Sequence, residues 1–191
     1  FSLAVRLRSD DPDSYGRRGA ILAKLGKDDR AMADLNEAIR LDPEHYEAYY
    51  NRGFVQGRMG RLRQALEDYS ETILLNPKFT SAYMKRGVLL GRLGRGEESI
   101  ADFNALLRLD PTHADAMANR GVAYGRKGQF QRALDDLEKA ALLEPDNAMI
   151  IINRGIFNEQ LGNRSLAIAD YKKAYGLGLR HPFLLQKMKA L

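Results

Sequence analysis

The apolar and small residues of this chain follow a pattern that recurs five times at a constant spacing. Each unit is numbered from 1 to 34, and the five units begin at Pro12, Tyr46, Thr80, Ala114 and Ala148. Within a unit, positions 4, 8 and 11 fall on one face of a helix, and positions 20, 24 and 27 fall on one face of a second helix. The pattern therefore predicts two amphipathic helices per unit.

Glycine and proline mark the ends of these predicted helices. Glycine suits a turn or a helix end, where a positive φ is often required. Proline cannot continue a helix. Position 32 is proline in the first four units and Leu179 in the last. Position 15 is always glycine, at Gly26, Gly60, Gly94, Gly128 and Gly162.

A glycine also stands inside the first helix of every unit, at position 8. Each such glycine costs about 1 kcal/mol of helix propensity relative to alanine. We therefore expect another helix to approach the backbone closely at this position. A single hairpin of two helices cannot bury its own apolar face, so the units should stack into a solenoid. The five glycines are Gly19, Gly53, Gly87, Gly121 and Gly155.

This constant period resembles that of the tetratricopeptide repeat family. The residues that carry the resemblance are Gly at position 8, a small residue at 20, Leu or an aromatic residue at 24 and Pro at 32. The resemblance implies an all-α fold, a right-handed superhelical solenoid of antiparallel helix pairs with a C-terminal capping helix. It implies one continuous domain with five repeats, at residues 12–45, 46–79, 80–113, 114–147 and 148–181. Residues 1–11 fit the second helix of a preceding partial repeat, and residues 182–191 fit the capping helix.

Composition narrows the classes of protein. Apolar residues make up 45% and charged residues 29% of the chain, as in ordinary folded proteins. No apolar run approaches the length that a membrane span requires, so no membrane insertion is predicted. The chain has no cysteine, which excludes disulfides and thiolate metal sites. Because the sequence begins at Phe1 rather than Met, we expect a fragment or a mature form. The sequence does not identify the cellular compartment, and the cytoplasm is weakly favoured.

The net charge of +5 is concentrated rather than spread. The basic excess lies mainly in residues 148–181 and at Lys187 and Lys189. Nucleic-acid binders more often carry a continuous basic stripe. The composition therefore predicts no nucleic-acid partner.

Arginine at position 7 and aspartate at position 23 occur together in every unit. Partly buried charges are normally paired, and arginine pairs with a carboxylate through two parallel hydrogen bonds. We therefore predict structural ion pairs, within a unit or between adjacent units. The residues are Arg18, Arg52, Arg86, Arg120 and Arg154 with Asp34, Asp68, Asp102, Asp136 and Asp170.

A separate stripe of the first helix is the candidate binding surface. Positions 2, 6, 9 and 13 share a face outside the packing face, and the resemblance implies that this helix lines the concave groove. An Asn side chain can both donate hydrogen bonds to a peptide backbone and accept them from it. Apolar neighbours can hold the side chains of the peptide. Arg or Lys favours an acidic or carboxylate-ended ligand. The predicted groove residues are Asn51, Phe54, Arg58, Lys85, Val88, Arg92, Asn119, Val122, Arg126, Ile152, Asn153 and Ile156.

These features predict a non-enzymatic interaction scaffold, which binds an extended peptide or helical segment of a partner protein. No catalytic, cofactor-binding or metal-binding residues are predicted, because the carboxylates are spread by the repeat and the three histidines all stand at position 34. Three alternatives stay open. They are a substrate-recruiting segment of a larger multidomain enzyme, RNA binding through the arginines at position 13, and self-association through the solenoid ends.

Overall fold

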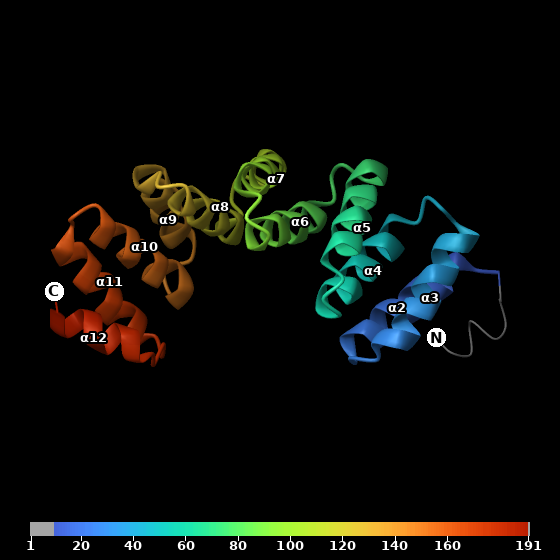
Figure 1. Cartoon of the computed structure of the whole chain (residues 1–191), viewed down its shortest axis with the longest axis horizontal. Coiled ribbons are helices and arrows are strands. Elements are labelled where there is room, and N and C mark those ends of the chain that lie inside the picture. The colour runs from blue at the N-terminus through green and yellow to red at the C-terminus, as the bar shows by residue number, and fades with distance from the viewer. Residues whose placement is uncertain (1–9, 191) are drawn as a thin grey trace. The chain divides into compact units, whose positions relative to one another are not determined.

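The computed structural model describes residues 10–190, and this range contains eleven helices and no strand (Figure 1). The first helices of the repeats are α2 (Pro12–Lys24), α4 (Tyr46–Arg58), α6 (Thr80–Arg92), α8 (Ala114–Arg126) and α10 (Ala148–Gln160). The second helices are α3 (Asp28–Leu41), α5 (Leu62–Leu75), α7 (Gly96–Leu109), α9 (Phe130–Leu143) and α11 (Arg164–Gly176). A last helix, α12, covers Pro182–Ala190. The all-α prediction of helix pairs is confirmed, whereas residues 1–9 of the predicted partial repeat lie outside the described residues.

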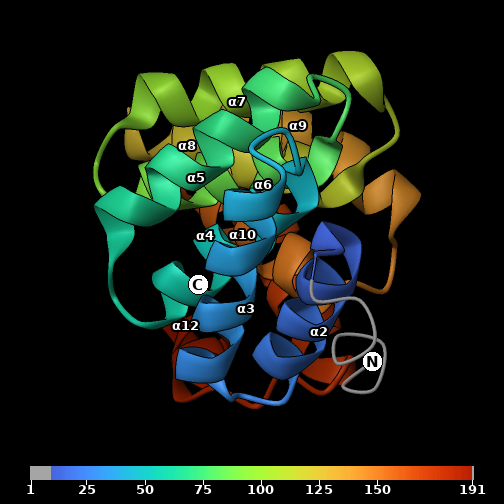
Figure 2. The same ribbon diagram turned by 90° about the vertical axis from the view of Figure 1, so that its right-hand side faces the viewer.

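The described residues form two compact units, and the boundary falls between Leu89 and Leu90, within α6. In the first unit, α2 packs beside α3, as Figure 2 shows, and α4 packs against α2, α3 and α5. In the second unit, α8 packs against α7, α9 and α10, and α11 packs against α10 and α12. The prediction of a single continuous domain stays a prediction. Within the described residues, no helix combines the length and the apolar character that crossing a membrane requires.

The glycine at position 15 turns the chain between the two helices of a repeat. These five glycines have φ between 71° and 82°, a left-handed conformation that favours glycine. After α2, the N–H of Gly26 donates to the carbonyl of Ala23 and the N–H of Lys27 to the carbonyl of Leu22. Such bonds satisfy carbonyl groups that a helix end leaves unpaired. The turn predicted from these glycines is confirmed.

The glycine at position 8 is where the second helix of the repeat approaches the first. A Cβ atom built on Gly19 would lie 2.7 Å from Cγ of Leu35, and one on Gly155 would lie 2.8 Å from Cε1 of Tyr171. At Gly121 the nearest atom would be the carbonyl oxygen of Ala133, at 2.9 Å. These distances leave no room for a side chain, which explains the glycine despite its poor helix propensity. The predicted close approach is confirmed at these positions.

The last helix closes the apolar core of the second unit. Leu184 of α12 and Tyr171 of α11 are both fully buried in the same cluster. The ring of Phe183 meets that of Tyr171 edge to face, with centroids 6.0 Å apart. Lys187 donates to Glu159 of α10 at 2.5 Å. Apolar burial and this ion pair together hold α12 against α10 and α11.

Candidate peptide-binding surface

In four of the five repeats, the arginine at position 7 pairs with the aspartate at position 23 of its own repeat. Each of these four arginines donates from Nε and Nη2 to the two carboxylate oxygens. The two distances are 2.5 and 2.6 Å for Arg18–Asp34, 2.8 and 2.7 Å for Arg52–Asp68, 2.7 and 2.7 Å for Arg120–Asp136, and 3.0 and 2.5 Å for Arg154–Asp170. In the third repeat, Arg86 and Asp102 belong to different units.

Two of these arginines, Arg52 and Arg120, also reach the preceding repeat, where they bond to the residue at position 25. Nη1 of Arg52 donates to Oδ1 of Asn36 at 2.9 Å, and Nη1 of Arg120 donates to Oδ1 of Asn104 at 2.6 Å. Each of these arginines therefore joins three helices, two in its own repeat and one in the repeat before. The sequence left open whether the pairing lies within or between repeats. The carboxylate lies within the repeat, and the neutral partner lies in the preceding one.

Pairing with the aspartates keeps these arginines charged, against the opposing effect of burial. The aspartates of the four pairs are buried, with 4–7% of their surface exposed. The hydrogen bonds from Arg52 to Asp68 raise the pKa of Arg52, and those from Arg120 to Asp136 raise the pKa of Arg120. A charged guanidinium whose hydrogen bonds are used in this way serves the packing of the helices.

The groove face of α4, in the first unit, is already occupied by contacts within the protein. Nδ2 of Asn51 donates to the carbonyl of Glu47 at 2.8 Å, one turn back in the same helix. Arg58 forms an ion pair with Asp28 of α3, with Nε 3.1 Å from Oδ2. The ring of Phe54 lies under Arg58, 5.5 Å from its guanidinium carbon. The charge of Arg58 is therefore paired with a carboxylate of the preceding repeat.

The second unit brings two of the predicted asparagines into one pocket. This pocket of about 150 Å³ lies between α8 and α10 and contains the predicted residues Asn119, Val122 and Asn153. Nδ2 of Asn119 donates to the carbonyl of Asp115 at 2.8 Å, as Asn51 does to Glu47. This bond holds the Asn119 side chain along its own helix. The other lining residues are Asp115, Ala118, Asn147, Met149 and Ile150.

An apolar pocket of about 400 Å³ adjoins it and contains the predicted residues Ile152 and Ile156 of α10. Its other side is formed by Leu179, His181 and Phe183, on the segment that leads from α11 into α12. The sequence analysis missed these three as site residues. The sequence did contain an indication of this, because Leu179 stands where the other repeats have proline. Met149 lines both pockets and leaves 58% of its surface exposed.

The remaining predicted groove residues lie apart from these two pockets. Nη1 of Arg126 donates to the carbonyl of Gly91 in the preceding repeat at 2.9 Å. Arg126 therefore caps a neighbouring helix, as Arg58 pairs with one. Lys85, Val88 and Arg92 lie exposed on α6 and line neither pocket. With Arg58 and Arg126 engaged inside the protein, the case for an acidic ligand in the groove is weaker than the sequence indicated.

Models of one repeat family match most of the chain. Residues 19–60 match a family described as "TPR repeat", and residues 46–79, 80–113 and 114–147 match families described as "Tetratricopeptide repeat". A comparison with curated proteins gave no match.

Solved structures with the same fold include three proteins with low sequence identity. YrrB, described as a TPR protein with an unusual peptide-binding site, is 20% identical, with 99% of this chain and 97% of that chain covered and a TM-score of 0.83. MamA from Desulfovibrio magneticus RS-1 is 20% identical, with 87% and 94% covered and a TM-score of 0.80. PilF from Pseudomonas aeruginosa is 18% identical, with 94% and 82% covered and a TM-score of 0.83.

At these identities the likeness shows the fold, and the repeat matches show the family. The matched residues run without a gap from 19 to 147 and include the Gly, small-residue and Pro positions that carry the pattern. The chain belongs to the tetratricopeptide repeat family.

Proposed function

We propose that this protein binds an extended segment of a partner protein across α8 and α10. The tetratricopeptide repeat fold is that of protein–protein interaction scaffolds, and this proposal names the surface and the ligand. The observation that carries it is the position of Met149, which lines both the asparagine-containing pocket and the apolar pocket. A single extended chain can therefore reach both pockets.

The two pockets offer different chemistry. Asn153 presents an amide group, which suits the backbone of an extended peptide, and Asn119, whose Nδ2 donates to the carbonyl of Asp115, lies beside it in the same pocket. Ile152, Ile156 and Phe183 present an apolar wall, which suits a large apolar side chain as an anchor. We therefore expect the ligand to be recognised by its backbone at α8 and by an apolar side chain at α10. The peptide-binding site described for YrrB is consistent with this type of ligand.

The exposed apolar surface favours a ligand at this place. Met149 is more than half exposed, although it stands on the face of α10 that carries Ile152 and Ile156. Contiguous apolar surface of this kind on a protein commonly marks a binding site. The same surface would also suit a second copy of the chain, and the test therefore includes the oligomeric state.

A peptide-display selection tests the proposal. We expect the enriched peptides to share a large apolar residue, and the double variant Asn119→Ala/Asn153→Ala to bind them about tenfold more weakly. Ile156→Ala should weaken them as well. The matched control is Asn51→Ala, which removes the equivalent asparagine and the same helical hydrogen bond in the first unit.

The proposal fails if Asn51→Ala weakens binding as much as the double variant, or if neither changes it. Light scattering measures whether the protein self-associates. If the molecular mass of the protein rises with its concentration, and Ile156→Ala abolishes this rise, the apolar pocket serves self-association instead.

A further inference from the structure

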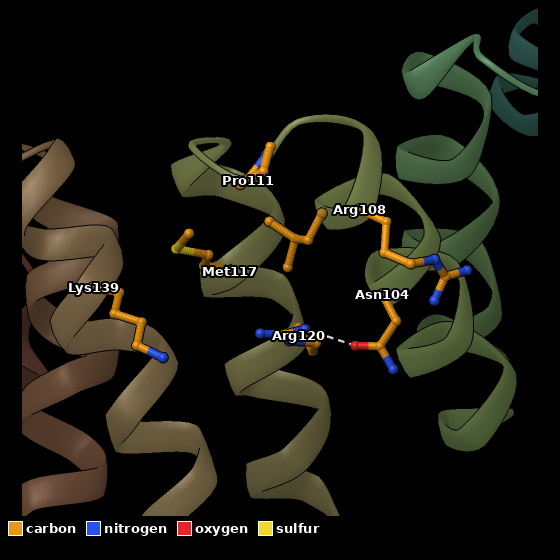
Figure 3. A pocket seen from close by; sticks show the side chains of 7 residues that line it. Asn104, Arg108, Pro111, Met117, Arg120 and Lys139 are labelled. Carbon is orange, nitrogen blue, oxygen red and sulfur yellow. Dashed lines mark hydrogen bonds between the residues drawn. The ribbon is translucent and has the colours of Figure 1, made fainter.

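A third pocket lies on the opposite side of α8 from the asparagine-containing pocket. It has a volume of about 380 Å³ and is lined from three helices, with Asn104 on α7, Arg120 on α8 and Lys139 on α9 among its residues (Figure 3). Successive residues turn by about 100° around an α-helix, so Met117 and Arg120 point away from Asn119 and Val122. This pocket is therefore separate from the proposed peptide-binding surface.

The lining of this pocket carries positive charge and has no acidic side chain. Its seven residues include three cations, one amide and three apolar side chains, and none is acidic. Among the side chains of residues 10–188, Arg108 and Lys139 make no ion pair or hydrogen bond to another side chain, and both are exposed. Arg120 contributes a charge whose carboxylate partner, Asp136, is buried behind it. The pocket thus presents unpaired positive charge to solvent.

Two residues of the lining, Asn104 and Arg120, have hydrogen-bond donors beyond those used in the bonds described above. Nη1 of Arg120 donates to Oδ1 of Asn104 at 2.6 Å, which orients the amide of Asn104 and leaves its Nδ2 group as a donor (Figure 3). Arg120 uses Nε, Nη1 and Nη2 for one bond each, so two of its five N–H groups remain. Together with Lys139, these groups suit an acceptor that carries negative charge.

We propose that this pocket is a second binding site, which takes a carboxylate side chain of an acidic segment in a partner protein. Leu107, Pro111 and Met117 line the same pocket as the cations. The ligand should therefore carry an apolar side chain next to its carboxylate. A nucleic acid is disfavoured, because phosphate backbones are held by basic stripes rather than by one cationic pocket with apolar walls. This site does not depend on the surface proposed at α8 and α10.

A titration with defined peptides followed by NMR tests the proposal on the whole chain. The probe is acetyl-Leu-Glu-Leu-Glu-Leu-amide, and its comparison peptide carries Gln in place of Glu. We expect saturable shifts of the amide signals of Asn104, Arg108 and Lys139 with the Glu peptide and none with the Gln peptide. Lys139→Glu should weaken binding about tenfold or more.

The matched control is Lys172→Glu, which makes the same change in net charge on an exposed residue of α11 outside the pocket. The proposal is overturned if Lys172→Glu weakens binding as much as Lys139→Glu, or if the Gln peptide binds equally well. It is also overturned if a short uridine RNA shifts these signals and the Glu peptide does not, because the pocket would then be a phosphate site.

Discussion

Arg120 donates two hydrogen bonds of 2.7 Å to Asp136, and so ties the first helix of its repeat to the second. Its third bond, to Asn104, reaches the repeat before. The same arrangement recurs at Arg52, with Asp68 and Asn36. A guanidinium has five N–H donors in a fixed plane, which lets one side chain join three helices. The repeated arginine is therefore part of how the repeats stack.

Removing one partner of this pair should destabilise the protein more than removing both. Arg120→Leu leaves Asp136 buried without its charged partner, and we expect a loss of about 3 kcal/mol in the free energy of unfolding. Adding Asp136→Leu should recover a large part of that loss, because two apolar side chains need no pairing. Urea denaturation of the two single variants and the double variant measures this. Losses that simply add would show that the two residues are not coupled.

Gly121 should not tolerate a side chain. Its Cβ would lie 2.9 Å from the carbonyl oxygen of Ala133, a backbone atom that cannot move without the helix. We expect Gly121→Ala to lower the free energy of unfolding by about 1–3 kcal/mol. Gly176→Ala is the control, because a Cβ there meets nothing within 4 Å. Thermal unfolding should show Gly176→Ala unchanged or slightly more stable, and an equal loss in both variants would refute the close approach.

Acid should release α12. The hydrogen bond from Lys187 lowers the pKa of Glu159 below its ordinary value of 4.5, and the Tyr171 hydroxyl, 2.7 Å away, adds to this. A carboxyl group with a lowered pKa stabilises the folded state above its unfolded pKa, and this contribution is lost as the pH falls through the folded pKa. We expect the NMR signals of the Leu184 methyl groups to shift as the pH falls through the folded pKa of Glu159, because Leu184 is fully buried.

The variant Glu159→Gln supplies the control for this pH dependence. It keeps an oxygen that can accept from Tyr171 and removes the titrating charge. The shift of the Leu184 signals below pH 4.5 should then disappear. If the shift persists, another carboxyl group holds α12.

Arg126 should contribute to stability rather than to peptide binding. Its Nη1 donates to the carbonyl of Gly91, near the end of α6. We expect Arg126→Ala to lower the free energy of unfolding by about 1 kcal/mol. The affinity for a peptide selected against the wild-type chain should change by less than about twofold. Arg92→Ala, at the same repeat position on α6, is the comparison, because Arg92 is exposed and lines neither pocket of the proposed surface. A marked loss of peptide affinity in Arg126→Ala alone would return this arginine to the binding surface.

The helix pairs were predictable from the residues alone. A constant period, with Gly26 and its equivalents at the turn and proline at the stop, specifies where each helix begins and ends. These are local effects, since glycine permits the positive φ found at Gly26 and the proline ring cannot continue a helix. The close approach at Gly121 was also predictable, because only packing explains a glycine kept inside a helix.

Which side chains are left to bind a partner depended instead on how the helices pack. Arg58 and Arg126 occupy equivalent positions in the predicted groove, yet both bond to the preceding repeat. Leu179 and Phe183 join Ile156 in one pocket, although their repeat pattern marks neither as a binding residue. Arg108 and Lys139 lie far apart in the sequence and share a pocket. Such outcomes depend on distances between helices, which a pattern of residue types along one chain does not contain.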